Sequence, residues 1–276
     1  MKHETFTHQG SRNLQIFMQS WTPDIGPLSA IILIHGLGEH SGRYLHVAEA
    51  FTQAGHAILA CDLPGHGKSQ GKRGHSSFDE ISDQIDHLAQ EAARRHPRKP
   101  LFVYGHSLGA EVVLYHLLKR QSTFKGAIAT SPGLATGTPV PAWKLLAARS
   151  LNKLAPDVTL DNGLDRSNLS RDPQVIHAYN HDPLVHNQIS ARLGWDLLEN
   201  GKWILAHAGQ LAVPTLLMQG TQDHIVSPQA TRHFFENAPT GKVTYKEWEG
   251  LYHETQNEPE KQQVLQYMLN WMSKQR

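Results

Sequence analysis

The sequence predicts an α/β fold with a mostly parallel central sheet, helices on both faces of the sheet and a helical cap insertion. The first observation is a set of short apolar runs, such as residues 30–34 and 57–61, which are typical of strands buried on both faces. The second is that segments with helical spacing of apolar residues, such as 78–96, alternate with these runs. The third is that the alternation stops at residue 133 and returns at residue 214. Repeated strand and helix units indicate a covered parallel sheet, and the interruption indicates an insertion.

The elements follow in order along the chain. Two segments, 4–8 and 14–21, flank a turn and are predicted to form a hairpin. Further strands are expected at 30–34, 57–61, 101–104, 126–130, 214–220 and 242–248, and core helices at 44–54, 78–96, 110–118, 228–237 and 258–273. The predicted core is 1–132 together with 211–276, and the predicted cap (lid) is 133–210, with helical pieces at 143–154, 173–179 and 189–208. A cap inserted there would cover the carboxyl ends of the strands, where ligands bind in such sheets.

The composition limits the classes of protein that the chain can belong to. Its 276 residues are 39% hydrophobic and 18% charged, which is typical of a globular protein. A formal net charge of +1 gives no overall field for nucleic acid, so no nucleic-acid partner is expected. Cys61 is the single cysteine and excludes an intramolecular disulfide. The amino-terminal residues lack the apolar core of a signal peptide, and the predicted location is the cytoplasm.

The strongest motif is Gly105-x-Ser107-x-Gly109, which stands between a predicted strand and a predicted helix. This strand, turn and helix pattern is that of a nucleophile elbow. Ser107 would occupy a strained turn that holds its hydroxyl clear of the sheet. Gly105 and Gly109 would lack side chains because the strand and the helix nearly touch there.

A serine hydroxyl needs a neighbouring base, and the sequence offers partners where two later strands end. Asp223 follows the strand at 214–220, and His253 follows the strand at 242–248. Singly, Asp223 could be a loop cap and His253 one of nineteen ordinary histidines. Their order after Ser107 and their positions favour a catalytic triad, with His253 as general base and Asp223 orienting the imidazole.

An acyl-transfer site also needs two N–H donors for the oxyanion. One candidate is the backbone of Leu108, directly after Ser107, and the other is the backbone of Leu37, in the glycine-rich loop after the first parallel strand. His35, in the same loop, is expected to be a structural turn residue.

The motifs together resemble the monoglyceride lipase and lysophospholipase branch of the α/β-hydrolases. The resemblance covers nearly the whole chain and is carried by residues 35–44, 62–69, 105–109 and 252–254 in the core and by 169–172 and 179–184 in the cap. It implies an α/β-hydrolase fold and a polar pocket for the glycerol head group, lined by Glu39, Arg43 and Tyr179. Three residues after His253, the family carries a histidine where this chain has Gln256.

The segment 143–154 allows two interpretations. Its apolar residues are weighted to one side and are interspersed with three basic residues, which suits a helix lying on a lipid surface. It could equally be a cap helix that packs on its own domain. No spacing typical of a metal site occurs among the histidines, so no metal is expected.

The sequence therefore predicts a serine ester hydrolase that cleaves monoacylglycerols through an acyl-Ser107 intermediate and needs no cofactor. Its partners would be a small lipid ester and, through the cap, transiently a membrane surface. A lysophospholipase or a general carboxylesterase is the alternative within the enzymes. From another class, a non-catalytic lipid-binding protein of the same fold is the alternative.

Overall fold

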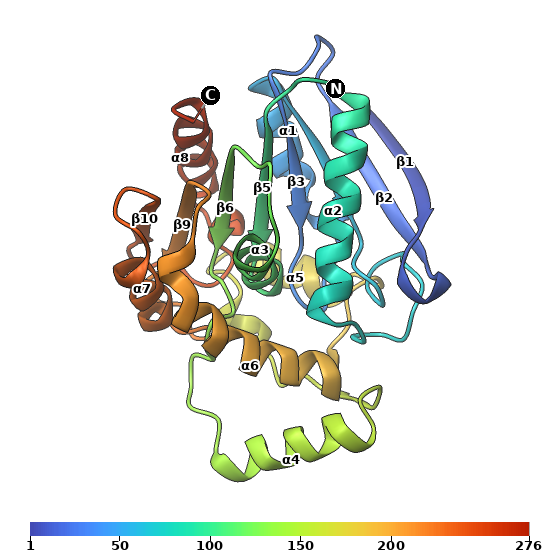
Figure 1. The fold of residues 1–276 in the computed structure, drawn as a ribbon, viewed down its shortest axis with the longest axis vertical. Helices are drawn as coiled ribbons and strands as arrows, with labels where there is room; N and C mark the ends of the chain where they lie inside the picture. The colour runs from blue at the N-terminus through green and yellow to red at the C-terminus, as the bar shows by residue number, and fades with distance from the viewer. Residues whose placement is uncertain (276) are drawn as a thin grey trace.

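The computed structural model describes residues 1–275, and residue 276, the last of the predicted core, lies outside them. Its centre is an eight-stranded sheet with the order β1-β2-β4-β3-β5-β6-β9-β10 (Figure 1). The amino-terminal hairpin pairs antiparallel with the edge of the sheet, and the other six strands are parallel. The strands are β1 (Lys2–Gln9), β2 (Gln15–Thr22), β3 (Ser29–Ile34), β4 (His56–Cys61), β5 (Leu101–His106), β6 (Gly126–Thr130), β9 (Thr215–Gly220) and β10 (Val243–Trp248). The predicted mostly parallel sheet is confirmed.

Helices cover both faces of this sheet because the central strands are apolar on both sides. In β3, Ile31 and Leu33 pack on one face, and Ile32 and Ile34 pack on the other. The helices are α1 (Leu45–Gln53) and α8 (Lys261–Ser273) on the first face, and α2 (Phe78–Arg95), α3 (Leu108–Lys119) and α7 (Pro228–Asn237) on the second. Residues 258–260, expected to be helical, precede α8, and the short 3-10 turn Thr255–Asn257 lies before them.

The segment between β6 and β9 does not join the central sheet. It contains α4 (Ala142–Leu154), α5 (Pro173–His181) and α6 (Ala191–His207), close to the predicted helical pieces. Two short strands, β7 (Thr159–Asp161) and β8 (Gln188–Ser190), pair antiparallel and were not expected from the sequence. In Figure 1, α6 lies beyond the lower end of the sheet and α4 lies farther out. Among the described residues, no helix is long and apolar enough to cross a membrane.

One carboxylate of the core is unpaired. Glu111 on α3 is fully buried, and neither of its oxygens has a hydrogen-bond partner within residues 1–275. A Cβ on Gly133 would contact Glu111 Oε2 at 2.5 Å, which places the carboxyl group directly behind the beginning of the segment between β6 and β9. Burial, together with the negative charge of Asp196 on α6, raises the pKa of Glu111 well above its usual range. The side chain is therefore held as a neutral acid with unmet hydrogen bonds.

We expect Glu111→Met to stabilise the fold, because a buried polar group without a partner costs about 1–3 kcal/mol. For a chain of this size the melting temperature should rise by roughly 2–12 °C. The native state holds a proton that the unfolded chain releases, so the wild type loses stability as pH rises above the ordinary glutamate pKa. The difference in melting temperature between the variant and the wild type, measured by calorimetry, should therefore be larger in mildly alkaline than in mildly acidic buffer.

Glu111→Gln is the matched control for this prediction. It removes the ionisable group and keeps the polar atoms, so its melting temperature should rise less. The difference in melting temperature between Glu111→Gln and the wild type should still widen with pH, because only the wild-type side chain at this position can ionise. A Glu111→Met variant that is less stable than the wild type at every pH would contradict the account.

Candidate active site

The bend between β5 and α3 carries Ser107 in a strained conformation. Its φ of 55° lies in the left-handed region, which residues other than glycine seldom adopt. A Cβ on Gly105 would collide with the backbone of Gly109, and a Cβ on Gly109 would collide with the carbonyl oxygen of Ile34. The structure thus has the close approach that the glycine spacing predicts, and Ser107 stands at the amino terminus of α3.

Ser107, His253 and Asp223 form one chain of hydrogen bonds. Ser107 Oγ lies 2.9 Å from His253 Nε2, and His253 Nδ1 lies 2.8 Å from Asp223 Oδ2. Because a carboxylate can only accept, the neutral ring carries its proton on Nδ1 and presents Nε2 to the hydroxyl. The other carboxylate oxygen, Asp223 Oδ1, accepts the N–H groups of Ile225 and Val226.

The buried imidazole has the electrostatics of a base. Burial disfavours the charged ring of His253, but the carboxylates of Asp223, Glu254 and Glu39 together outweigh burial and raise the pKa of His253. Burial would also raise the pKa of Asp223, yet His253 and the N–H donors hold it below its usual range. A fixed carboxylate behind the ring suits His253 to accept a proton from the Ser107 hydroxyl.

The loop that carries His253 is held by backbone contacts. Ser131 Oγ donates to the His253 carbonyl at 2.7 Å, and the N–H of Glu254 donates to the Leu169 carbonyl at 2.8 Å. Glu258 Oε1 accepts the N–H of Tyr252 at 2.6 Å. Both flanks of His253 are therefore fixed, one of them by the segment between β6 and β9.

The loop after β3 approaches Ser107 from the other side. A Cβ on Gly36 would lie 3.3 Å from Ser107 Cβ, so the two backbones are close there. Leu37, the next residue, lines the same cavity as Ser107 and Leu108. Leu108 is the first residue of α3, where backbone N–H groups have no partner within the helix. His35 accepts the N–H of Leu63 at 2.9 Å, which fits its predicted structural role.

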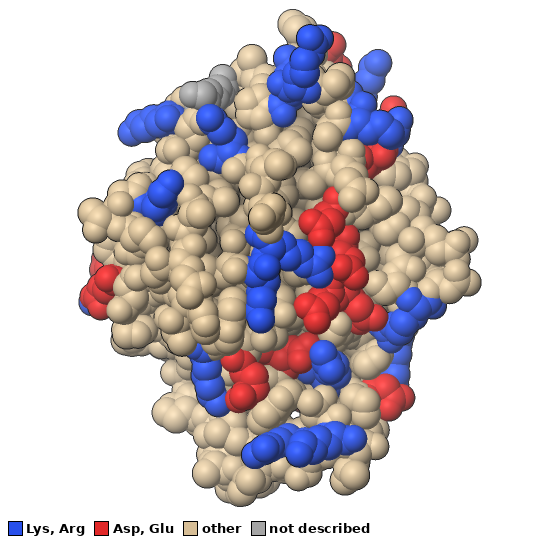
Figure 2. Space-filling model, viewed as in Figure 1, with Lys and Arg blue, Asp and Glu red and all other residues tan. Residues whose placement is uncertain are grey.

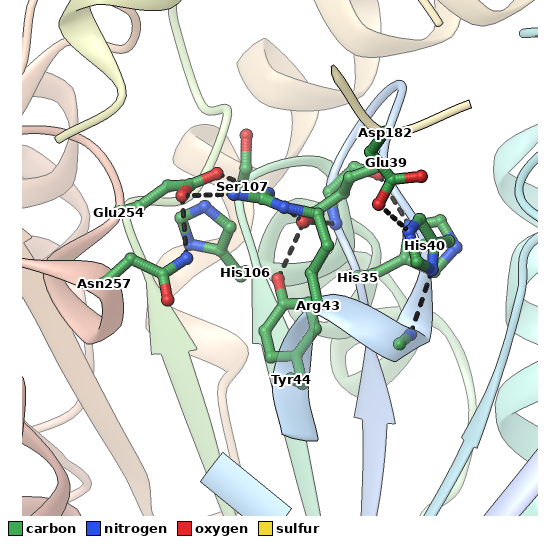
Figure 3. A network of polar contacts seen from close by, with 12 residues as sticks. His35, Glu39, His40, Arg43, Tyr44, His106, Ser107, Asp182, Glu254 and Asn257 are labelled. Atoms are coloured by element: carbon green, nitrogen blue, oxygen red, sulfur yellow. Dashed lines mark hydrogen bonds and ion pairs between the residues drawn. The ribbon is translucent and has the colours of Figure 1, made fainter. Parts of the chain in front are cut away.

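A buried ionic network joins this loop to the His253 loop (Figure 3). Glu39 Oε1 accepts the N–H of Gly36 at 2.6 Å and the hydroxyl of Tyr44 at 2.7 Å. Glu39 Oε2 pairs with Arg43 at 2.5 Å. Arg43 also binds both oxygens of Glu254, at 2.7 and 2.8 Å. Burial alone would raise the pKa of Glu39, but Arg43 and the neighbouring polar groups lower it to about 2.

The predicted head-group residues Glu39, Arg43 and Tyr179 lie together. The guanidinium carbon of Arg43 is 4.6 Å from the centre of the Tyr179 ring, a cation–π distance. Tyr179 is 3% exposed, and no other group within residues 1–275 hydrogen-bonds its hydroxyl. Gln256 is also buried, and neither atom of its side-chain amide has a partner in the described part of the chain.

A cavity of about 480 Å³ opens from Ser107, within the range of small-molecule sites. Its walls are mostly apolar, and two elements between β6 and β9, α4 and α6, contribute Leu145 and Leu197. The remaining lining residues are Leu37, Leu108, Gly133, Leu134, Ala135, Thr136, Val140, Asn162, Ile189, Gly194, Leu198, Lys202, Ile225 and Val226. Over residues 1–275, no group of three or more His, Cys, Asp and Glu side chains is arranged to hold a metal ion.

Several residues around the site were not assigned a role from the sequence. Glu254 belongs to the motif at 252–254, but its pairing with Arg43 joins two loops that are 211 residues apart in the sequence. Gln219 donates to Asp223 Oδ2 at 2.8 Å and accepts from Thr231 at 2.9 Å, so it fixes the carboxylate from behind. The only indication of this role in the sequence is a glutamine near the end of an apolar strand. Ser131, which holds the His253 carbonyl, gave none.

Comparison with known proteins identifies the family. Residues 26–260 match the family model described as serine aminopeptidase, S33. A monoacylglycerol lipase of Mycolicibacterium smegmatis is 34% identical over 265 residues, which cover 95% of this chain and 94% of the relative. The chain belongs to the monoglyceride lipase family of the α/β-hydrolases. This membership confirms the predicted resemblance.

Other known proteins are similarly related. The crystal structure of a monoacylglycerol lipase from Paleococcus ferrophilus superposes with a TM-score of 0.88 at 35% identity, covering 95% of this chain and 99% of that one. A phospholipase of Bacillus subtilis is 34% identical over 251 residues, covering 90% of this chain and 96% of the relative. The chain spans only 27% of one longer relative, an abhydrolase domain-containing protein of Dictyostelium discoideum that is 37% identical over 258 residues. As a family member the protein is an ester hydrolase.

We expect Asp223→Asn to lower kcat by roughly 10⁴-fold with little change in thermal stability, because asparagine favours the wrong imidazole tautomer. The carboxylate also raises the pKa of His253, so that pKa should fall in the variant. Ester hydrolysis and NMR titration of the ring measure the two effects. Asp86→Asn is the matched control, because Asp86 on α2 also faces a histidine, His116 on α3, at 3.7 Å and away from the site. Near-normal turnover in Asp223→Asn would assign the orienting role to another group.

Proposed function

We propose that the protein hydrolyses monoacylglycerols to a fatty acid and glycerol through an acyl-Ser107 intermediate. The observation that carries the proposal is the hydrogen-bonded chain of Ser107, His253 and Asp223 at the end of a largely apolar cavity. The cavity suits a single acyl chain. Two related proteins, from Mycolicibacterium smegmatis and Paleococcus ferrophilus, are named monoacylglycerol lipases and support this substrate.

In the proposed reaction, Ser107 Oγ attacks the ester carbonyl as His253 Nε2 takes the hydroxyl proton. The N–H groups of Leu37 and Leu108 stabilise the oxyanion of the tetrahedral intermediate. His253 then gives its proton to the departing glycerol oxygen, which leaves the fatty acyl group on Ser107. A water molecule, deprotonated by His253, attacks the acyl-enzyme, and the fatty acid is released as Ser107 regains its proton.

Residues 133–210 form the proposed cap of this site. Their side chains supply a large part of the cavity wall, including Val140, Leu145 and Leu197. The remaining core comprises residues 1–132 and 211–276. A cap of this kind shields the apolar acyl chain from bulk water and selects substrates by the shape of that chain.

Tyr179 is the proposed contact of the glycerol head group. No described residue hydrogen-bonds its hydroxyl, which lies 3.6 Å from the position that a Cβ on Gly38 would take, beside the loop of Leu37. Glu39 and Arg43 form the charged wall under the Tyr179 ring. A hydroxyl that is free to bind a ligand favours a substrate that bears free hydroxyl groups.

The relatives also support a second substrate class. The Bacillus subtilis relative is named a phospholipase, so a lysophospholipid with the same acyl chain is the alternative. The family model is named for an aminopeptidase. Binding of a substrate ammonium group would need a free carboxylate, whereas Glu39 and Glu254 are both paired with Arg43, which favours an uncharged ester.

We expect kcat/KM for a monoacylglycerol to exceed that for the methyl ester of the same fatty acid by about tenfold, since each hydrogen bond to a glycerol hydroxyl contributes about 0.5–1.5 kcal/mol. Tyr179→Phe should remove most of this preference and leave methyl-ester hydrolysis nearly unchanged. Both esters and the matching lysophosphatidylcholine should be assayed below their aggregation limits.

Two variants serve as controls for this experiment. Ser107→Ala should lower kcat for every ester by about 10⁶-fold. Tyr245→Phe removes a tyrosine hydroxyl that bonds Glu247 instead, and it should not change the preference. Equal rates for the glyceryl and methyl esters in the wild type would reduce the proposal to a general carboxylesterase, and faster hydrolysis of lysophosphatidylcholine would favour the phospholipase.

We also propose that α4 lies on an anionic lipid surface while substrate enters. Trp143 is 67% exposed and Leu146 is 65% exposed, although Leu145 between them lines the cavity. Lys144, Arg149 and Lys153 on the same helix are exposed, and a row of basic side chains crosses the position of α4 in Figure 2. Exposed apolar side chains beside basic ones are typical of helices that lie in a lipid interface.

Sedimentation with vesicles tests the proposed membrane contact. The wild type should bind vesicles that contain phosphatidylglycerol more strongly than vesicles of phosphatidylcholine alone, because the basic residues attract anionic lipid. Trp143→Ala combined with Leu146→Ala should weaken binding by about tenfold or more, since each buried apolar side chain contributes about 1.5–3 kcal/mol. Ile25→Ala, which removes an 85% exposed apolar side chain elsewhere, is the control. Unchanged binding in the double variant would show that α4 packs only on its own domain.

A further inference from the structure

The two loops that meet at Ser107 are connected by one buried arginine. Arg43 follows the proposed oxyanion loop and contacts Glu39, whose other oxygen accepts the N–H of Gly36, the residue before Leu37. Arg43 also binds both oxygens of Glu254, the residue after His253. Figure 3 shows the Arg43 side chain extending between the two carboxylates. A continuous path of polar contacts therefore runs from Gly36 to Glu254.

The geometry of this path is rigid. The side chains of Glu39, Arg43 and Glu254 are 4%, 10% and 2% exposed, so water screens their charges little. Two parallel N–H bonds to one carboxylate fix the guanidinium plane as well as its position. Asn257 donates to Glu254 Oε2 at 2.7 Å, which holds that carboxylate from its other side.

We propose that Glu39, Arg43 and Glu254 form a positioning clamp that holds the proposed oxyanion loop and the His253 loop in fixed register around Ser107. The inference rests on the proposed roles of Ser107, His253 and Leu37. None of the three clamp residues needs to touch the reacting atoms. Both carboxylates are already occupied by Arg43, and Glu39 also by Gly36 and Tyr44, so their contacts serve the protein's own loops.

The clamp has a distinct kinetic signature. Loss of loop register should lower kcat for every ester alike, because the oxyanion donors and His253 act on the carbonyl group that all these esters share. A residue that binds glycerol would instead change kcat/KM for the glyceryl ester and leave the methyl ester unaffected. The comparison of the two esters thus separates positioning from head-group binding.

Glu254→Gln is the primary variant, because glutamine keeps the shape and loses the ion pair. We expect kcat to fall by about 10- to 100-fold for both the glyceryl and the methyl ester, with KM nearly unchanged, since displacement of reacting groups by about 1 Å has an effect of that size. Arg43→Lys keeps the charge without the paired N–H bonds and should retain more activity than Arg43→Gln. Arg95→Gln is the matched control, because Arg95 also bridges two carboxylates, Glu4 and Glu91, away from the site.

The pH profile provides a readout that a purely structural role would not change. The groups that face His253 are Asp223, Ser107 and His106, with the charges of Glu254 and Glu39 nearby. Removing the negative charge of Glu254 should lower the pKa of His253 and move the acid limb of the kcat/KM profile to lower pH. Removing the positive charge in Arg43→Gln should move the same limb to higher pH.

The outcome of a double-variant cycle completes the test. Arg43→Gln combined with Glu254→Gln should lower kcat by much less than the product of the two single effects, because both changes break one connection. If the double variant lowers kcat by the product of the two single effects, or if the losses are confined to the glyceryl ester, the clamp is overturned. Either result would leave the assignment as an ester hydrolase unchanged. Ser107→Ala with full activity would instead overturn the proposed nucleophile. Circular dichroism and melting temperatures establish that each variant is folded.

Discussion

The close approach of α3 to the ends of β3 and β5 is the constraint on which the site depends. Gly105 and Gly109 permit it, and it leaves Ser107 at the bend with a positive φ. The strand order then brings the other groups to that point, because β3 and β6 flank β5, and β9 lies beyond β6 beside β10. Asp223 follows β9, and His253 follows β10. Loops at neighbouring strand ends can converge on one hydroxyl without any long connection.

The sequence predicts the fold well because the buried strands are short, apolar and separated by clear helical periodicity. The hydrogen-bonded neighbours of Ser107 were also predictable, since their positions follow from strand ends. The strands at 159–161 and 188–190 were not predictable. Each is three residues long and mostly half-buried or exposed, so its sequence shows no alternation of apolar and polar residues. The pairing of Arg43 with Glu254 was not predictable for a different reason. Either residue alone is an ordinary charged side chain, and only the folded loops make them neighbours.

The segment between β6 and β9 contacts the loops of the site as well as lining its cavity. The N–H of Glu254 donates to the Leu169 carbonyl, and Arg171 pairs with Glu258 at 3.1 Å, so this segment holds the loop of His253. On the opposite side, Asp182 binds His40, which belongs to the loop after β3. Displacement of the segment would therefore disturb both loops. Motion of the segment would disturb these loops least if it were confined to α4, which has no buried residue.

Three buried charges beside the site require a physical reason, since a buried ion pair is often no more stable than apolar side chains of the same size. Two carboxylates and one arginine leave a net negative charge close to His253. That charge adds to Asp223 in raising the pKa of the imidazole, against the effect of burial. Apolar side chains in place of the three charged ones could fill the same space. They would neither accept the N–H of Gly36 nor place a negative charge near His253. The network is thus better explained by the alignment of two loops and the basicity of one ring than by the stability of the fold.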